Sequence, residues 1–128
     1  MVAVVTGEGG SGGALGIACG NRVLIMEHAI YSVIPPEGAN SILWHSSRTP
    51  GEAARAMKIS AQDLLKMKIV DRIVPEPPGG AHADPQAAIA AVGDAIEAEL
   101  KSLEGLSSQA LKAQRAERFY AIGREGLN

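Results

Sequence analysis

The distribution of hydrophobic and polar positions along the chain predicts several short strands. Val2–Thr6 is a run of mostly β-branched residues, which is typical of a strand covered on both faces. Two more apolar runs, Arg22–Glu27 and Ala29–Ile34, predict further strands, and the two prolines that follow end the second. Ile69–Val74 has the same composition and predicts another strand.

Between and after these runs, the spacing of apolar residues changes to that of helices. Thr49 and Pro50 fit the N-cap and first position of a helix, with Glu52 in its first turn. Pro75–Pro85 is a Pro/Gly-rich loop. The predicted helices are Gly13–Cys19, Glu37–Ser47, Pro50–Met57, Ala61–Lys68, Gln86–Leu103 and Ser108–Gly123. Alternation of helices and short strands predicts an α/β protein, divided near Pro85 into a sheet-bearing part (1–84) and an all-helical part (85–128).

Composition narrows the class of protein. The 128 residues suffice for one modest core, and a formal net charge of -2 argues against a nucleic-acid or membrane-surface footprint. Cys19 is the single cysteine, so we expect neither an internal disulfide nor a metal cluster, and we expect a reducing cytoplasm as the location. We also expect Cys19 to be buried on its short apolar helix. No apolar run approaches the length of a membrane-spanning helix.

The glycine-rich segment Gly7–Gly16 is the strongest candidate for chemistry. It lies between a predicted strand and a predicted helix, where backbone N–H groups and the helix dipole favour negative charge. Glycines would let that charge approach the main chain closely. The physics predicts an anion or oxyanion site without identifying the anion.

Two motif readings compete for this segment. Gly7, Gly9 and Gly12 match a dinucleotide-binding G-x-G-x-x-G, with Glu27 as the ribose-binding acid. The dinucleotide-binding interpretation is weakened by the length of the predicted helix, because the stretch between Gly12 and Arg22 looks too short for a crossover between parallel strands. Alternatively, Ser11 matches the G-x-S-x-G of a hydrolase nucleophile elbow, and Asp71 and His82 follow it in hydrolase order.

Two further readings need no motif. Glycines can simply permit tight packing, although six glycines in the ten residues Gly7–Gly16 exceed what packing requires. The helix N-terminus can also form an oxyanion hole for a thioester or ureido carbonyl, which does not require the next strand to be the parallel neighbour. The residues alone leave these two readings open.

Three blocks of sequence resemble the alpha-subunit family of acetyl-coenzyme A carboxylase carboxyltransferases. They are Gly7–Gly16 (GEGGSGGALG), Tyr31–Trp44 (YSVIPPEGANSILW) and Ile73–His82 (IVPEPPGGAH), in the family's order and spacing. The helical tail also resembles the family's C-terminus. The resemblance implies a crotonase-like fold of repeated ββα turns, with 1–84 as the C-terminal half of the core and 85–128 as a helical extension.

The resemblance also implies an activity and its partners. The carboxyl group would pass from carboxybiotin, on the biotin carboxyl carrier protein, to acetyl-coenzyme A, giving malonyl-coenzyme A for fatty acid biosynthesis. A beta subunit would hold the acetyl-coenzyme A, and biotin carboxylase would join the larger complex. By position, the N–H groups of Gly12 and Gly13 would stabilise the biotin ureido oxygen, while Gly9, Gly10 and Ser11 would shape the cofactor-binding turn. No metal ligand is implied in this chain.

The family's subunit is considerably longer than this chain. We therefore expect a fragment that lacks the loop supplying the other half of the oxyanion site, and that is inactive alone. Three features remain without a firm role. Glu37 could cap the helix after it or face the site, and His82 could organise its loop or face the active-site cleft. Lys112, Arg115 and Arg118 form a basic side of the last helix, which is either solvated or a contact for a partner.

Overall fold

The computed structural model describes residues 1–45 and 49–124. Its elements confirm a mixed α/β protein. The strands are β1 (Val2–Val5), β2 (Glu8–Gly10), β3 (Arg22–Met26), β4 (Ile30–Ser32) and β5 (Arg72–Val74). The helices are α1 (Ser11–Ala18), α2 (Pro36–Trp44), α3 (Pro50–Met57), α4 (Ala61–Lys66), α5 (Pro85–Leu103) and α6 (Ser108–Ala121). No helix in the described ranges is long and apolar enough to cross a membrane.

Successive strands alternate between two parallel sheets. One sheet has the order β1-β3-β5, with Val5 beside Ile25 and Ile25 beside Ile73. The other pairs β2 with β4, so that Gly9 lies beside Tyr31. The expectation that the segment before Arg22 is too short for a parallel crossover is wrong. The connection contains β2 as well as α1, which gives it the length that a parallel crossover needs.

The strand β2 is the element that the sequence pattern did not predict. Its residues, Glu8–Gly10, have low strand propensity, and their pairing with β4 depends on a segment far along the chain. The other elements match the predicted ones, although β4 and β5 are shorter than expected and α1 begins earlier. The predicted helical positions Ser46 and Ser47 lie outside the described residues.

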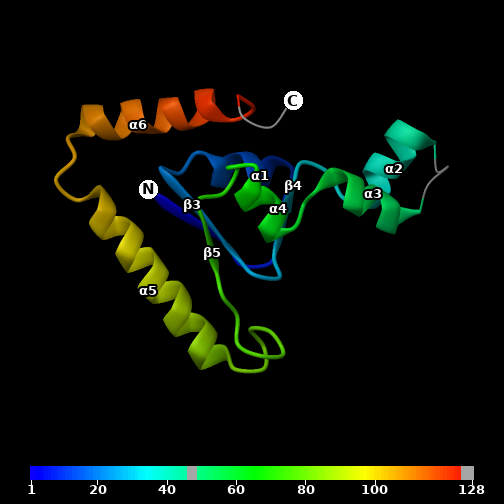
Figure 1. Cartoon of the computed structure of the whole chain (residues 1–128), viewed down its shortest axis with the longest axis horizontal. Coiled ribbons are helices and arrows are strands. Elements are labelled where there is room, and N and C mark those ends of the chain that lie inside the picture. The colour runs from blue at the N-terminus through cyan, green and yellow to red at the C-terminus, as the bar shows by residue number, and fades with distance from the viewer. Residues whose placement is uncertain (46–48, 125–128) are drawn as a thin grey trace.

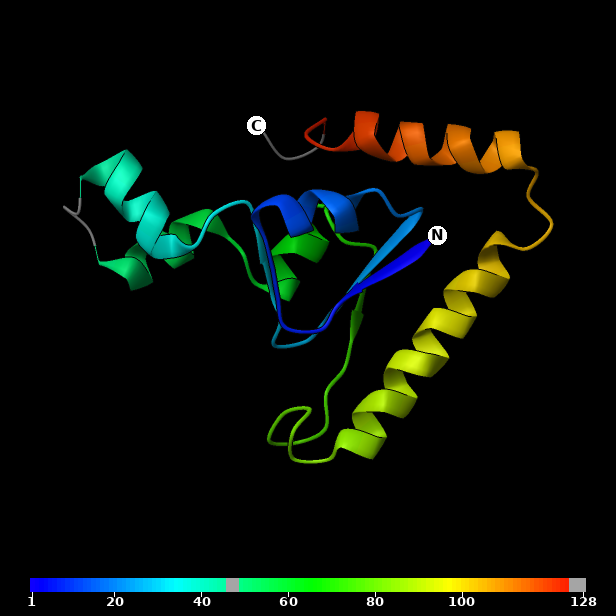
Figure 2. The same ribbon diagram turned by 180° about the vertical axis from the view of Figure 1, so that it is seen from behind.

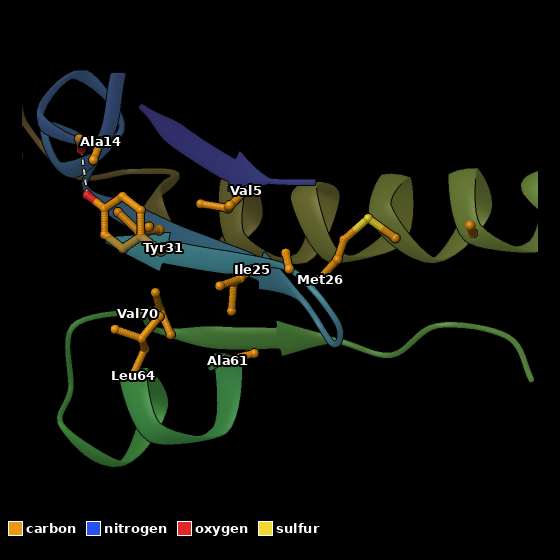
Figure 3. Packing of buried hydrophobic residues seen from close by; sticks show 11 residues of the cluster. Val5, Ala14, Ile25, Met26, Tyr31, Ala61, Leu64 and Val70 are labelled. Atoms are coloured by element: carbon orange, nitrogen blue, oxygen red, sulfur yellow. Dashed lines mark hydrogen bonds between the residues drawn. The ribbon is translucent and has the colours of Figure 1, made fainter. Parts of the chain in front are cut away.

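The main hydrophobic core lies against β3. Val23, Leu24 and Ile25 are each 0% exposed, as expected for a central parallel strand covered on both faces. One cluster joins β1 and β3 to α1, β4 and α4, with Val5, Ile25 and Leu64 among its members (Figure 3). A second, smaller cluster joins Leu24 and Val74 to Ala95 of α5, so α5 covers the opposite face.

The helices surround the sheets on three sides. Helix α5 runs diagonally along the β1-β3-β5 sheet, and α6 turns back from one end of the molecule along the side where α1 lies (Figures 1 and 2). Several hydrogen bonds tie α6 to the rest, among them Asn21 Nδ2 to Leu111 O at 2.9 Å, Arg22 to Gln114 Oε1 at 3.2 Å and Arg118 to Ile69 O at 2.6 Å. Helices α2 and α3 pack on each other at the other end of the molecule.

Candidate functional site

The candidate site is the turn in which β2 passes directly into α1. Gly10 is the N-cap residue in an extended conformation, and no side chain caps the helix. Ser11 has a positive φ of 50°, an uncommon conformation for a residue with a side chain. The N–H groups of the first turn have no partner within a helix. Gly12 and Gly13 belong to this first turn, and both residues are exposed.

The glycines of this turn have different surroundings. Gly9 is buried, and a Cβ atom placed on it would lie 2.8 Å from Tyr31 Cδ2 and 3.3 Å from Val5 Cγ1. Packing therefore requires glycine at position 9. A Cβ atom on Gly12 or Gly13 would meet nothing within 4 Å, and neither residue has a positive φ. The packing of the described residues gives no reason for glycine at positions 12 and 13.

Tyr31 links the two sides of this turn. Its ring lies in the main core, and its hydroxyl donates a buried hydrogen bond of 2.5 Å to the carbonyl oxygen of Ala14 in α1. Burial raises the pKa of the Tyr31 phenol, and attraction to the charged Arg118 offsets this only in part. Sequence reasoning assigned Tyr31 no role. The available signal was a tyrosine within an apolar strand of a chain with few aromatic residues.

Two adjacent cavities open beside the turn. The larger, of about 700 Å³, is lined by Gly9 and Gly10 and by the charged residues Glu8, Glu37, Arg55 and Asp63. The second, of about 490 Å³, is mostly apolar and has Ser11 and Tyr31 in its wall. Gly12 and Gly13 line neither cavity and face outward from the start of α1.

The residues of the two motif readings do not converge on this turn. The Glu27 carboxylate accepts a hydrogen bond of 3.1 Å from the Glu76 N–H, in the loop after β5. Asp71 accepts from the Val23 N–H at 2.7 Å, and also pairs with Arg118 at 3.3 Å. His82 lines a separate small cavity in the Pro75–Pro85 loop. The cavity lined by Ser11 includes neither Asp71 nor His82, so the structure assembles no nucleophile triad there.

A buried carboxylate joins that loop to the turn between β3 and β4. Glu76, with a side chain 7% exposed, accepts hydrogen bonds from the His28 N–H and Nδ1, both at 3.1 Å, and from the Ala81 N–H at 3.0 Å. Burial acts to raise the pKa of Glu76, but these hydrogen bonds outweigh it and lower the pKa below its usual value. The pairing was not predicted because His28 and Glu76 are far apart in sequence.

Several single-residue predictions have definite outcomes. The prediction that Cys19 is buried is wrong: it is exposed just after the end of α1, whose one buried residue is Ala14. Glu37 lies in the first turn of α2 but does not cap it, because the N-cap position is Pro35. The basic side of α6 is divided, since Arg118 is half-buried in its pair with Asp71 and its neighbours on that side are exposed.

The molecule is thus an α/β protein whose strands alternate between two parallel sheets and whose glycine-rich helix N-terminus lies at the edge of a cavity. A family model described as acetyl co-enzyme A carboxylase carboxyltransferase-like matches residues 1–123. The chain belongs to this family.

Curated relatives agree with this assignment. The chain is 74% identical over 126 residues to an acetyl-coenzyme A carboxylase carboxyl transferase subunit alpha from Phenylobacterium zucineum, covering 98% of this chain and 39% of the relative. It is 66% identical to the same subunit from Caulobacter sp. (strain K31), over 99% of this chain and 40% of the relative. It is 54% identical to the same subunit from Gluconacetobacter diazotrophicus, over 100% of this chain and 40% of the relative. The chain thus spans about 40% of the length of these relatives. None of these findings supports a nucleotide-binding module at Gly7–Gly12.

Proposed function

We propose that this chain is part of the alpha subunit of a biotin-dependent carboxyltransferase, and that it contributes one oxyanion-binding turn to the transfer of a carboxyl group to acetyl-coenzyme A. The product would be malonyl-coenzyme A. The observation that supports this proposal most directly is the pair Gly12 and Gly13. Their N–H groups lie in the first turn of α1, where they have no partner within the helix, and a Cβ atom on either residue would meet open space. The family supplies the chemistry that such a pair would serve.

The fold supports a crotonase-like core built from ββα turns. β1, β2 and α1 form one such unit, and β3 and β4 followed by α2–α4 form a second with the same assignment of strands to sheets. In this proposal residues 1–84 are the C-terminal half of the core, and 85–128 are a helical extension that begins at α5.

The residues present fit a biotin ureido oxygen. Carboxybiotin, carried on the biotin carboxyl carrier protein, supplies the carboxyl group and leaves a ureido oxygen that becomes negative. Gly12 and Gly13 can approach such an oxygen closely, because no side chain covers their N–H groups. N–H donors that already point at the oxygen on which negative charge develops need not reorganise during the reaction. Each such donor typically stabilises the transition state by roughly 3–4 kcal/mol. Gly9, Gly10 and Ser11 shape the turn that aims these donors.

The remaining components come from outside this chain in the proposal. A beta subunit holds acetyl-coenzyme A, and biotin carboxylase and the carrier protein complete a cytoplasmic hetero-oligomer. Residues beyond this chain would supply the second half of the oxyanion site. We therefore expect the isolated 128 residues to have no transferase activity.

A substitution of Gly12 tests the proposal. In the complete alpha subunit assembled with its beta subunit, Gly12→Val should reduce malonyl-coenzyme A formation by about a hundredfold or more, because the side chain covers one donor. The matched control is Gly93→Val on α5, which also replaces an exposed helical glycine with open space around it. Gly93→Val should retain the wild-type rate. An unchanged rate in Gly12→Val would contradict the oxyanion assignment.

A further inference from the structure

The sequence of helix α1 contributes little to the stability and orientation of the helix. Three of its eight residues (SGGALGIA) are glycine, the least favourable helix residue after proline. No side chain caps its N-terminus. Ala14 is its one buried residue, and Ile17 packs partly buried against the same core, so tertiary contacts at these two positions orient the helix, with Ala14 the nearer to the first turn.

Tyr31 provides that contact from the neighbouring sheet. It is paired in register with Gly9, and its ring crosses β2 at the space that the missing Cβ of Gly9 leaves open. Beyond β2 the hydroxyl reaches the Ala14 carbonyl oxygen at 2.5 Å (Figure 3). One side chain therefore connects β4, β2 and the first turn of α1.

We propose that Tyr31 is a positioning residue for carboxyl transfer, whose hydroxyl, by holding the Ala14 carbonyl, aims the N–H groups of Gly12 and Gly13. This inference rests on the proposed oxyanion role of those two glycines. Ala14 directly follows Gly13, so a rotation of α1 that breaks the hydrogen bond also redirects both donors. Because burial raises the pKa of the phenol, the hydroxyl keeps its proton at neutral pH and remains a donor.

The substitution Tyr31→Phe removes the hydroxyl and keeps the ring that packs over Gly9. In the complete alpha subunit assembled with the beta subunit, kcat should fall by about tenfold or more, because small misplacement of catalytic groups can cost up to roughly a hundredfold. KM for acetyl-coenzyme A should stay within about twofold, since binding of this substrate does not use the donors. Tyr120→Phe, at a 66% exposed tyrosine on α6, is the matched control and should keep both constants.

Amide hydrogen exchange gives a second readout that a purely structural role would not change selectively. In Tyr31→Phe the amides of Leu15–Ala18, whose hydrogen bonds lie within α1, should exchange faster, while those of Val23–Met26 in the β1-β3-β5 sheet keep wild-type protection. Should the variant be unstable at the assay temperature, the exchange comparison is made at a lower one where it remains assembled. Wild-type exchange at Leu15–Ala18, or a wild-type kcat, overturns the role of Tyr31.

The outcome for Gly12→Val separates this inference from the proposed function. A slow Gly12→Val variant with a normal Tyr31→Phe variant leaves the oxyanion turn standing and rejects Tyr31 as its positioning residue. A wild-type complex without carboxyl transfer, or a fully active Gly12→Val, rejects the proposed function itself. Slow turnover in both variants, with unchanged Tyr120→Phe, supports both.

Discussion

Glycine serves two different purposes within a few residues of this chain. At Gly9 the cause is steric, because Tyr31 occupies the volume that a side chain would need. At Gly12 and Gly13 the described residues leave that volume empty, as the proposed approach of an oxygen from outside the chain would require. The pattern of glycines in the sequence cannot make this distinction. It depends on Tyr31, which is brought over Gly9 only when β2 pairs with β4.

Glu76 is the residue at which pH should alter stability. Its carboxylate holds His28 and Ala81 through three hydrogen bonds. Because its pKa in the folded protein is lower than the usual 4.5, the native state binds fewer protons than the unfolded one. The stability it contributes is complete above about pH 4.5 and is lost as the pH falls through the lower folded-state pKa.

Replacing Glu76 tests this linkage. Glu76→Gln should lose about 1–3 kcal/mol of unfolding free energy near pH 7, as expected for buried hydrogen bonds to a charged group. The difference from wild type should shrink below pH 4.5, as measured by urea unfolding across the pH range. Glu97→Gln is the control, because this exposed glutamate pairs with Lys101 one helical turn away on the same exposed face of α5. A Glu76→Gln deficit that is the same at pH 7 and pH 3.5 would show that its ionisation is not linked to folding.

At the scale of elements, local signals were sufficient for some segments and insufficient for others. Helix α3 was predicted with its observed bounds because Thr49, Pro50 and Glu52 specify its start within four residues, and the capping box is present. Strand β2 was missed because nothing in Glu8–Gly10 favours a strand until β4 lies beside it. The parallel crossover from β1 to β3 was not expected for the same reason, because part of its length is β2. The position of the candidate turn could be predicted from sequence, but its neighbours could not.

Helix α6 offers an element-scale prediction. It has no buried residue, so its attachment depends on polar contacts, among them those of Arg118, whose side chain is 11% exposed. Arg118 donates to Ile69 O and pairs with Asp71, which also accepts from the Val23 N–H. Arg118→Ala in the complete subunit should cost about 1–3 kcal/mol of unfolding free energy.

The same variant should also show which part of the molecule loses stability. Amides of α6 should lose protection from hydrogen exchange in Arg118→Ala while those of β3 keep it, because the helix detaches without unfolding the sheet. The exposed neighbour Arg115→Ala is the control and should change stability by less than about 0.5 kcal/mol. Equal effects of the two substitutions would mean that α6 is held by something other than Arg118.

At the scale of the whole molecule, the two faces of the β1-β3-β5 sheet are covered by helices from both the first and the last part of the chain. Helices α1 and α4 contribute to the main cluster, and α5 covers the opposite face through Ala95 while its first turns also reach the main cluster (Figures 1 and 2). The composition change at Pro85 therefore marks a change of element type and not the edge of the core. Ala88 of α5 belongs to the main cluster with Val5 and Val23.

This arrangement predicts that residues 1–84 need residues 85–128 to keep their structure. Without α5, Leu24 and Val74, both 0% exposed, would lose their contacts with Ala95. Exposing each such side chain costs about 1.5–3 kcal/mol, a large share of the stability of a small domain. A subunit ending at residue 84 should therefore bind a hydrophobic dye and lose amide protection in β3. The segment 85–128 added as a separate peptide should restore part of that protection. Cooperative unfolding and wild-type protection of β3 in the shortened subunit would instead establish 1–84 as an independent folding unit.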